Sequence, residues 1–305
     1  MVQLDIRPLG YALGAEVRGI DLRQTPSRET VAAIRAAWHE SLVVCFPDQD
    51  LGPDELVAFS ELFGEVDDNR AIPHNRHPEN PKVALVSNKR IGDKPWGGYR
   101  NGQNWHSDLS YTDRPATGTF LHCKERPDVG GDTMFANMYL AYERLSPTMR
   151  GIIDDLDAVH DITLVKNLAQ REPAVVERMR TLNPPVVHPA VRTHPETGRK
   201  ALFVNERVRN FVGMEPEESA PILDFLNRHA VTPEFVYRHR WNVGDLVLWD
   251  NRCTMHIALG DFDMWNQPRH LIRTALLGPK TGRLLIANAP GDDAVALRDA
   301  VAALA

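Results

Sequence analysis

The stretch WHSDLSYTDRPATGTFLHC (105–123) is where the chain changes from helical to β-strand character. WHSDLSY (105–111) and TGTFLHC (117–123) alternate or run apolar, and the turn-forming residues TDRPA separate them. If the first run is a strand, His106 and Asp108 share a face, because alternate residues of a strand project to the same side. A buried carboxylate needs a partner that offsets its desolvation, and a metal ion is one such partner. The alternative is that the two side chains pair with each other on a surface strand.

Helices are predicted mostly before this stretch and in insertions after it. SRETVAAIRAAWHESL (27–42) opens on a serine and repeats apolar residues at helical spacing, and GPDELVAFSELFG (52–64) has a proline in its first turn. Two later helices are expected at 146–156 and 215–230, each with a proline close to its start.

Short strands account for most of the remaining pattern. They are expected at 43–47, 83–88, 117–123, 130–136 and 269–278, with hairpins over 186–205 and between 234–241 and 245–251. This pattern favours a mainly β fold with helices, an α+β jelly-roll sandwich with flanking helices, over a parallel α/β sheet. We expect one domain over 1–280, with the jelly-roll core at about 83–279, followed by a C-terminal tail over 281–305 that ends in a short helix.

Composition limits the class of protein. Of the 305 residues, 43% are hydrophobic and 25% are charged, as in an ordinary globular protein. The net charge of -6 argues against nucleic acid as a partner, and no apolar run approaches the roughly 18 residues that span a membrane. The start lacks the layout of a signal peptide, and Cys45, Cys123 and Cys253 are far apart. We therefore expect a cytoplasmic protein with reduced thiols and with no nucleic-acid or membrane partner.

Three His-x-acid triplets occur in the chain. HPE at 77–79 lies in a loop rich in proline and asparagine, and HPE at 194–196 lies at a predicted hairpin turn. In both, the central proline opposes a strand that would place the two side chains on one face. Only His106-Ser107-Asp108 lies in a β-like run with bulky neighbours, so it is the candidate metal site.

A second histidine strengthens this candidate. In DLVLWDNRCTMHIA (245–258), His256 follows an apolar strand and a polar turn, which would direct it toward the mouth of a cavity. Two histidines and one carboxylate form the ligand set of non-haem Fe(II) oxygenases, and zinc is the rival metal. The alternative is a core histidine that hydrogen-bonds to the backbone.

Two arginines lie in the strand PRHLIRTALLG (268–278). Arg269 and Arg273 are four residues apart and share one face of the strand with Leu271 between them. Buried guanidinium groups call for carboxylates, which they bind through charge-assisted hydrogen bonds. We interpret the pair as two anion-binding positions, one for an oxo-diacid cosubstrate and one for an anionic substrate. An edge strand with two solvated arginines is the alternative.

Together these residues resemble the Fe(II)- and 2-oxoglutarate-dependent dioxygenases of the taurine dioxygenase and chlorophenoxyacetate dioxygenase (TauD/TfdA) family. The family pattern is H-x-D, then a threonine, a distal histidine and an arginine shortly beyond it. Here His106-x-Asp108 is followed by Thr133, His256 and Arg269. LGAEVRGIDL (13–22), LFG (62–64), NWHSD (104–108) and WDNRCTMH (249–256) also resemble family stretches, and the resemblance covers about residues 3–279.

The resemblance implies a role for each of these residues. His106, Asp108 and His256 would be the catalytic metal ligands for Fe(II), and Thr133 and Arg269 would bind 2-oxoglutarate. Arg273 would bind the substrate anion, and Leu109 would contact the substrate through its backbone amide. The implied fold is a double-stranded β-helix, and the implied cosubstrates are 2-oxoglutarate and O2. As partners we expect a small anionic molecule and further copies of the chain, in a dimer or a tetramer.

The substrate prediction comes from a departure from the family. Taurine dioxygenase has a histidine and a tyrosine in the segment that corresponds to DDNRAIPHNRHP (67–78), where this chain has Asn69 and Ile72. Loss of that polar pair disfavours a small sulfonate, and Ile72 would contact a bulkier apolar body. We therefore predict hydroxylation of an aryloxyalkanoate-like or other aromatic carboxylate, with release of succinate and CO2. A taurine or alkylsulfonate dioxygenase, a zinc hydrolase and a non-catalytic binding module on the same fold are the alternatives.

Overall fold

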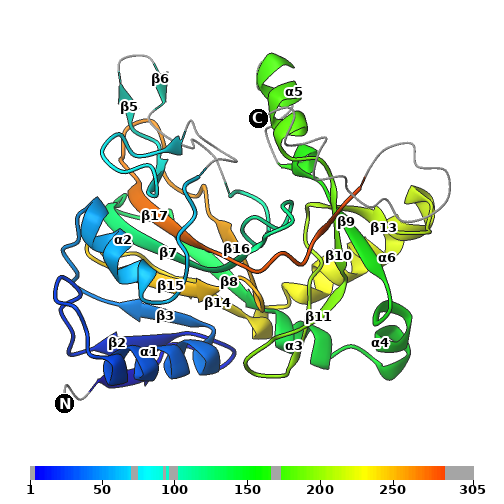
Figure 1. Ribbon diagram of the computed structural model, residues 1–305, viewed down its shortest axis with the longest axis horizontal. Helices are drawn as coiled ribbons and strands as arrows, with labels where there is room; N and C mark the ends of the chain where they lie inside the picture. The colour runs from blue at the N-terminus through cyan, green and yellow to red at the C-terminus, as the bar shows by residue number, and fades with distance from the viewer. Residues whose placement is uncertain (1–3, 70–74, 92–93, 96–101, 166–172, 286–305) are drawn as a thin grey trace.

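The structure of the protein is a computed structural model that describes residues 4–69, 75–91, 94–95, 102–165 and 173–285. Two sheets face each other in the half of the molecule shown at the left of Figure 1. The larger sheet has the order β1 (Asp5–Pro8), β2 (Ala15–Arg18), β3 (Val43–Phe46), β15 (Leu246–Asp250), β7 (Ala116–Glu125), β17 (His270–Leu277) and β4 (Ala84–Ser87). The smaller sheet has the order β14 (Val236–His239), β8 (Thr133–Asn137) and β16 (Thr254–Ala258).

Two helices cover the outer face of the larger sheet. In α1 (Arg28–Ser41), the Ser27 side chain accepts a hydrogen bond from the Thr30 amide, as expected for an N-cap. Helix α2 (Pro53–Glu61) packs on β17 and has its proline at the first helical position. Apolar residues of both helices form one core cluster with the outward side chains of the sheet, which include Phe120 and Leu248.

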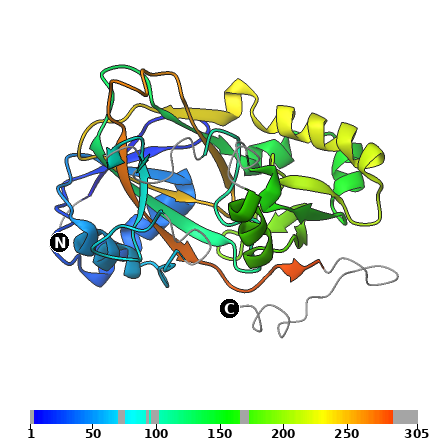
Figure 2. The ribbon, with the colours of Figure 1, turned by 90° about the horizontal axis from the view of Figure 1, so that it is seen from above.

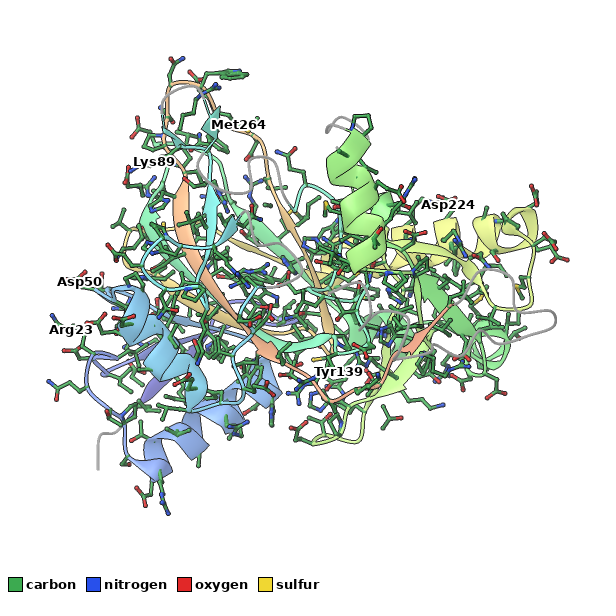
Figure 3. The ribbon with its side chains drawn as sticks, turned by 45° about the horizontal axis from the view of Figure 1, so that its top comes forward. Arg23, Asp50, Lys89, Tyr139, Asp224 and Met264 are labelled. Atoms are coloured by element: carbon green, nitrogen blue, oxygen red, sulfur yellow. The ribbon has the colours of Figure 1, made fainter. Side chains whose placement is uncertain are left out.

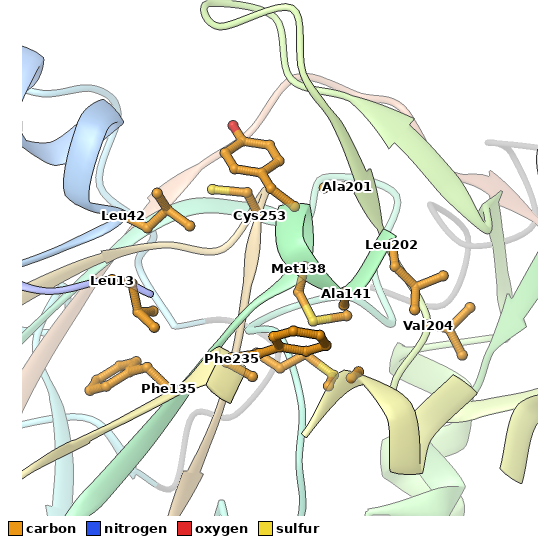
Figure 4. Packing of buried hydrophobic residues seen from close by; sticks show 14 of the residues in the cluster. Leu13, Leu42, Phe135, Met138, Ala141, Ala201, Leu202, Val204, Phe235 and Cys253 are labelled. Carbon is orange, nitrogen blue, oxygen red and sulfur yellow. The ribbon is translucent and has the colours of Figure 1, made fainter. Parts of the chain in front are cut away.

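The inner core lies between the larger sheet and the rest of the molecule. Along β15, Leu246 and Leu248 face the helices whereas Val247 and Trp249 face inward, because side chains alternate along a strand. Figure 4 shows part of the inner cluster, with Met138 between Phe135 of β8 and residues of a neighbouring hairpin. The central strands β3, β15 and β17 therefore contribute one face to each core.

A second group of elements flanks the sheets, at the right of Figures 1 and 2. A four-stranded sheet has the order β13 (Val208–Phe211), β9 (Asp157–His160), β10 (Val186–Pro189) and β18 (Arg283–Leu284), and β11 (Val191–Thr193) forms a hairpin with β12 (Lys200–Leu202). The helices here are α3 (Met138–Glu143), α4 (Pro147–Ile153), α5 (Pro173–Leu182) and α6 (Pro216–Ala230), with short 3-10 turns η2 (Ile162–Leu164) and η4 (Pro233–Phe235). A small hairpin pairs β5 (Arg90–Ile91) with β6 (Lys94–Pro95).

Many charged side chains lie at the periphery. In Figure 3, Arg23, Asp50, Lys89 and Asp224 point away from the body of the molecule. No helix in the described ranges is long and apolar enough to cross a membrane. Cys45, Cys123 and Cys253 are buried free thiols, as the sequence predicts.

Most predicted elements are confirmed, and two predictions are wrong. Residues 105–111 do not form a strand: His106 makes an isolated bridge to His256, and the chain then turns at Asp108. The strands within 234–241 and 245–251 do not pair with each other, since β14 pairs with β8 and β15 pairs with β3 and β7. All of β15 is buried and both of its edges are occupied, so no edge remains for β14. The short helix predicted at the end of the C-terminal tail lies outside the described residues.

Candidate active site

A cavity of about 110 Å³ lies between the two sheets. Residues of β16, β17, β8 and the turn around Asp108 line one part of it, and apolar residues of β4, β7, η2 and α5 line the rest. The cavity brings together seven residues that the sequence singles out: His106, Asp108, Leu109, Thr133, His256, Arg269 and Arg273. Segments that are far apart in the chain therefore contribute to one space.

His106, Asp108 and His256 form the centre of the cavity wall, and each is at least nine-tenths buried. The Nε2 atom of His106 lies 3.9 Å from Asp108 Oδ1, and the Nε2 atom of His256 lies 3.8 Å from Asp108 Oδ2. One ligand atom from each of the three residues lies within 4.8 Å of the other two. These distances are too long for hydrogen bonds, so the three groups surround a space and do not satisfy one another.

The backbone positions the two histidines. His256 lies in β16, and its amide and carbonyl exchange two hydrogen bonds with those of His106. The His106 Nδ1 atom is 2.7 Å from the Asn104 carbonyl oxygen and donates to it, which leaves the Nε2 lone pair directed at Asp108. The Nδ1 atom of His256 is buried without a hydrogen-bond partner. The sequence pattern predicts that His256 lies just past a strand, but it lies within β16, a strand that the pattern does not reveal.

Asp108 is oriented by residues that the sequence does not indicate. Thr119 of β7 donates a hydrogen bond of 2.8 Å to Asp108 Oδ2, and Asn251 accepts one of 3.0 Å from the Asp108 amide. Asn251 also donates to the Thr119 hydroxyl, which closes the network. Arg273 donates to Asp108 Oδ1 over 3.0 Å. Only the fold brings these groups together, so no local signal could have identified Thr119 or Asn251.

Electrostatics keep these three groups in the states that a metal requires. Burial lowers the pKa of His256 to about 4 and holds the pKa of His106 well below its ordinary value, so both rings are neutral. Burial alone would raise the pKa of Asp108, but the charge of Arg273 is among the effects that bring it below its ordinary value. Two neutral imidazoles and a carboxylate are ready ligands for a divalent cation.

Two other groups of potential ligands occur in the described part of the chain, and each differs from this one. His194 Nε2 lies 3.0 Å from Asp250 Oδ2, and His239 Nε2 lies 3.2 Å from Asp245 Oδ2, so these residues are already hydrogen-bonded. Their cysteines, Cys253 and Cys45, have pKa values raised by burial. Only the group at His106 has donor atoms that converge without satisfying one another, so its residues fit a metal ion.

The remaining triplets are explained by turns, as predicted. His77 Nδ1 accepts a hydrogen bond from the Glu79 amide, and His194 Nδ1 accepts from the amides of Glu196 and Thr197. In both triplets the histidine therefore accepts its hydrogen bonds from backbone amides of the same turn. Neither places an imidazole and a carboxylate at the cavity.

Thr133 and Arg269 meet at a second position in the cavity. Arg269 Nη2 donates to the Thr133 hydroxyl over 3.3 Å, and its Nε donates to the Gly131 carbonyl over 2.7 Å. Trp241 Nε1 also donates to the Thr133 hydroxyl, over 3.1 Å. Because that oxygen accepts two hydrogen bonds, its own hydrogen is left to donate to a ligand. Burial lowers the pKa of Arg269 to about 10, which still leaves it cationic at neutral pH.

The predicted substrate-contacting residues have different outcomes. Leu109 lines the cavity and adopts a left-handed φ of 52°, which is uncommon for a leucine. Asn69 is buried and donates its side-chain amide to the Pro81 carbonyl, away from the residues that line the cavity. Ile72 lies outside the described residues.

Comparison with known proteins agrees with this geometry. The model of the "Taurine catabolism dioxygenase TauD, TfdA family" matches residues 5–275. The α-ketoglutarate-dependent 2,4-dichlorophenoxyacetate dioxygenase of Cupriavidus pinatubonensis is 36% identical over 260 residues, which cover 82% of this chain and 90% of that protein. The α-ketoglutarate-dependent sulfate ester dioxygenase of Pseudomonas putida is 32% identical over 287 residues, covering 91% and 90%.

A crystal structure of a taurine dioxygenase from Burkholderia xenovorans superimposes with a TM-score of 0.76 at 33% sequence identity, and the match covers 98% of both chains. This likeness confirms the predicted α+β class and the jelly-roll architecture. The chain belongs to the taurine catabolism dioxygenase TauD, TfdA family and is a 2-oxoglutarate-dependent dioxygenase.

Proposed function

We propose that this chain hydroxylates an aryloxyalkanoate-like or other aromatic carboxylate, with Fe(II) held by His106, Asp108 and His256. The observation that carries the proposal is the content of one cavity: three convergent metal donors, a threonine and arginine pair, and a further arginine. Ferrous iron bound at the three donors would supply the dioxygen chemistry that oxidises a substrate C–H bond while 2-oxoglutarate is converted to succinate and CO2.

The residues around the metal donors divide the binding of the two acids. Thr133 and Arg269 offer a free hydroxyl hydrogen and a buried guanidinium, which suit the distal carboxylate of 2-oxoglutarate. Arg273 lies 3.0 Å from a metal-binding carboxylate, so an anion that Arg273 binds would lie beside the metal position. This placement would hold a substrate carbon close to the reaction centre and fix its orientation.

The rest of the cavity favours an apolar body. Leu109, Leu121, Ile162 and Met179 line the wall, and Trp249 lies beside His256 with ring centroids 4.7 Å apart. Such a surface binds an aromatic ring and excludes water from the reaction. These features, together with the likeness to a dichlorophenoxyacetate dioxygenase, support an aromatic carboxylate.

A sulfonate or sulfate ester is the second candidate substrate class. Arginine binds sulfate and carboxylate oxygens in the same manner, and one relative is named a sulfate ester dioxygenase. A zinc hydrolase and a non-catalytic module are disfavoured, because neither needs a site for an oxo-diacid. The apolar wall favours the aromatic carboxylate over a small sulfonate.

The test combines a spectrum with a product assay. Fe(II) and 2-oxoglutarate added without oxygen should give the visible metal-to-ligand charge-transfer colour, and aromatic carboxylates should then drive succinate release in air. His256→Ala should lose both signals. Arg273→Leu should keep the colour but require a much higher substrate concentration. Because Arg273 also contacts Asp108, the colour is measured with excess Fe(II). Loss of colour in Arg273→Leu that excess Fe(II) does not restore would contradict the assignment of the two arginines, and succinate release with sulfonates alone would favour the second substrate class.

A further inference from the structure

Arg207 is a buried guanidinium that the proposed function does not use. It lies directly before β13, and its backbone is held by the side chain of Asn205 and the amide of Asp161. The residue is only 6% exposed, and it lines the same cavity as Arg273. Its Nε atom is buried without a hydrogen-bond partner, and no ion pair joins Arg207 to a residue in the described ranges.

Among the residues that the structure describes, the guanidinium of Arg207 contacts an aromatic ring. The guanidinium carbon lies 5.3 Å from the centroid of Tyr111, a cation–π contact. By contrast, the buried Arg252 forms ion pairs with both Asp250 and Glu196. Because a buried charge without a counter-charge is costly, binding of an anionic ligand would stabilise Arg207 in this position.

The charges of the residues that line the cavity indicate how much negative charge a ligand must supply. Asp108 is the one carboxylate that lines it among the described residues, against Arg207, Arg269 and Arg273. Ferrous iron and Arg269 would be balanced by Asp108 and the two carboxylates of 2-oxoglutarate. The two neutral histidines add no charge. Arg273 shares Asp108 with the metal position, so the positive charges in the described part of the cavity would exceed the negative ones by two once iron and 2-oxoglutarate are bound.

Other carboxylates close to these arginines do not fill this role. Asp67 is near Arg273 but lines a different surface pocket. Glu206 precedes Arg207 but is exposed to solvent. A ligand is therefore the remaining source of negative charge for the described part of the cavity.

We propose that Arg207 and Arg273 together bind two separate carboxylates of the substrate, so that the preferred substrate is an aromatic dicarboxylate. This inference rests on the proposed function and narrows its substrate class. Arg273 holds one carboxylate next to the metal donors. Arg207 holds the other on the side of the cavity formed by Tyr111, where the ring keeps the guanidinium in place.

A matched pair of acids tests this inference. 2-Phenoxypropionate and 2-phenoxysuccinate share the aryl ether and the carbon that carries it, and they differ in one added carboxylate. Each is titrated calorimetrically, without oxygen, into the protein loaded with Fe(II) and 2-oxoglutarate, so that no turnover is needed. We expect the wild type to bind phenoxysuccinate about 10- to 100-fold more tightly, the range for one charge-assisted hydrogen-bonded contact.

Two variants assign that preference to Arg207. Arg207→Met keeps an apolar side chain of similar length and should lose most of the preference for phenoxysuccinate. Arg209→Met is the matched control: Arg209 lies two residues further along, is exposed and pairs with Asp161, so the preference should stay. Arg207→Lys keeps the positive charge and should retain part of the preference for phenoxysuccinate. If Arg207→Met does not fold, a smaller preference in Arg207→Lys than in the wild type tests the role of Arg207 instead.

The outcomes separate this inference from the proposed function. Equal affinity of the wild type for the two acids, or equal losses for both acids in Arg207→Met, would overturn the role of Arg207 while leaving the dioxygenase assignment intact. If the wild type develops no charge-transfer colour with Fe(II) and 2-oxoglutarate, the proposed metal site fails and the inference fails with it.

Discussion

Replacing Thr119 with valine tests how the fold prepares Asp108 for a metal. The Thr119 hydroxyl is fully buried, donates to Asp108 Oδ2 over 2.8 Å and accepts from Asn251 over the same distance. Valine has nearly the same shape, so Thr119→Val removes two hydrogen bonds and leaves the Asp108 side chain held by Arg273 alone among these partners. Partners that orient a metal ligand are typically worth about 10- to 100-fold in metal affinity, or about 1.4–2.7 kcal/mol.

The assay is a calorimetric titration of the metal-free protein with Fe(II) or Mn(II) under nitrogen. Thr117→Val is the control, because Thr117 lies on the same face of β7 and its hydroxyl donates to the Leu276 carbonyl, over 3.5 Å, rather than to Asp108. Its backbone carbonyl, which accepts from the Asn251 amide, is unchanged by the substitution. The control should bind metal like the wild type. If Thr119→Val also binds metal with wild-type affinity and remains folded, the hydrogen-bond network does not position Asp108, and the reasoning is refuted.

Three further predictions concern the cosubstrate site and stability. A Cβ at Gly131 would lie 3.2 Å from the Arg269 side chain, so Gly131→Ala should raise the KM for 2-oxoglutarate at least tenfold. The control is Gly198→Ala: Gly198 has a similar φ of 69° and open space where the Cβ would lie, so this change should leave the KM unchanged. Burial lowers the pKa of His188 to about 4, so its contribution to folding is complete above pH 6.5 and is lost as the pH falls toward 4. The free energy of unfolding in urea should therefore drop by about 2 kcal/mol less between pH 7 and pH 5 in His188→Gln than in the wild type. Phe120→Ala should lower that free energy by about 3–5 kcal/mol without changing the KM, since Phe120 packs on the helix-covered face, and a change below about 1 kcal/mol would contradict its role in the core.

Local sequence patterns predicted much of the fold. Residues that cap helices predicted where α1 and α4 begin, and Ser27 and Ser146 do accept the expected hydrogen bonds. Runs of apolar residues predicted β7 and β17, because a strand in a sandwich buries both faces. Pairing between strands was less predictable, and the hairpin expected from 234–251 is in fact a crossing between two sheets.

The candidate site was predicted for two different reasons. Arg269 and Arg273 stood out from the residues alone, because charged side chains are rare in an apolar strand. Thr133 was recognised only through the family resemblance, because a threonine after a glycine turn has no local mark of a ligand. His106 and Asp108 were predicted as a metal site through a strand that the structure does not contain, and both line the cavity beside His256. The roles of these residues and the oligomeric state stay predictions.

The sequence by itself determined which segments are apolar, where helices start and which residue types could hold a metal and two acids, because these depend on neighbours within a turn or a strand. Only the tertiary structure decided that Thr119 and Asn251 orient Asp108 and that Trp241 occupies one lone pair of Thr133. It also decided that Arg207 is buried beside Tyr111, with no ion-pair partner in the part of the chain that the structure describes. These contacts join residues that are at least 11 positions apart and mostly more than 90, and the partner of a hydrogen bond at such a distance is set by how the sheets pack rather than by the local pattern.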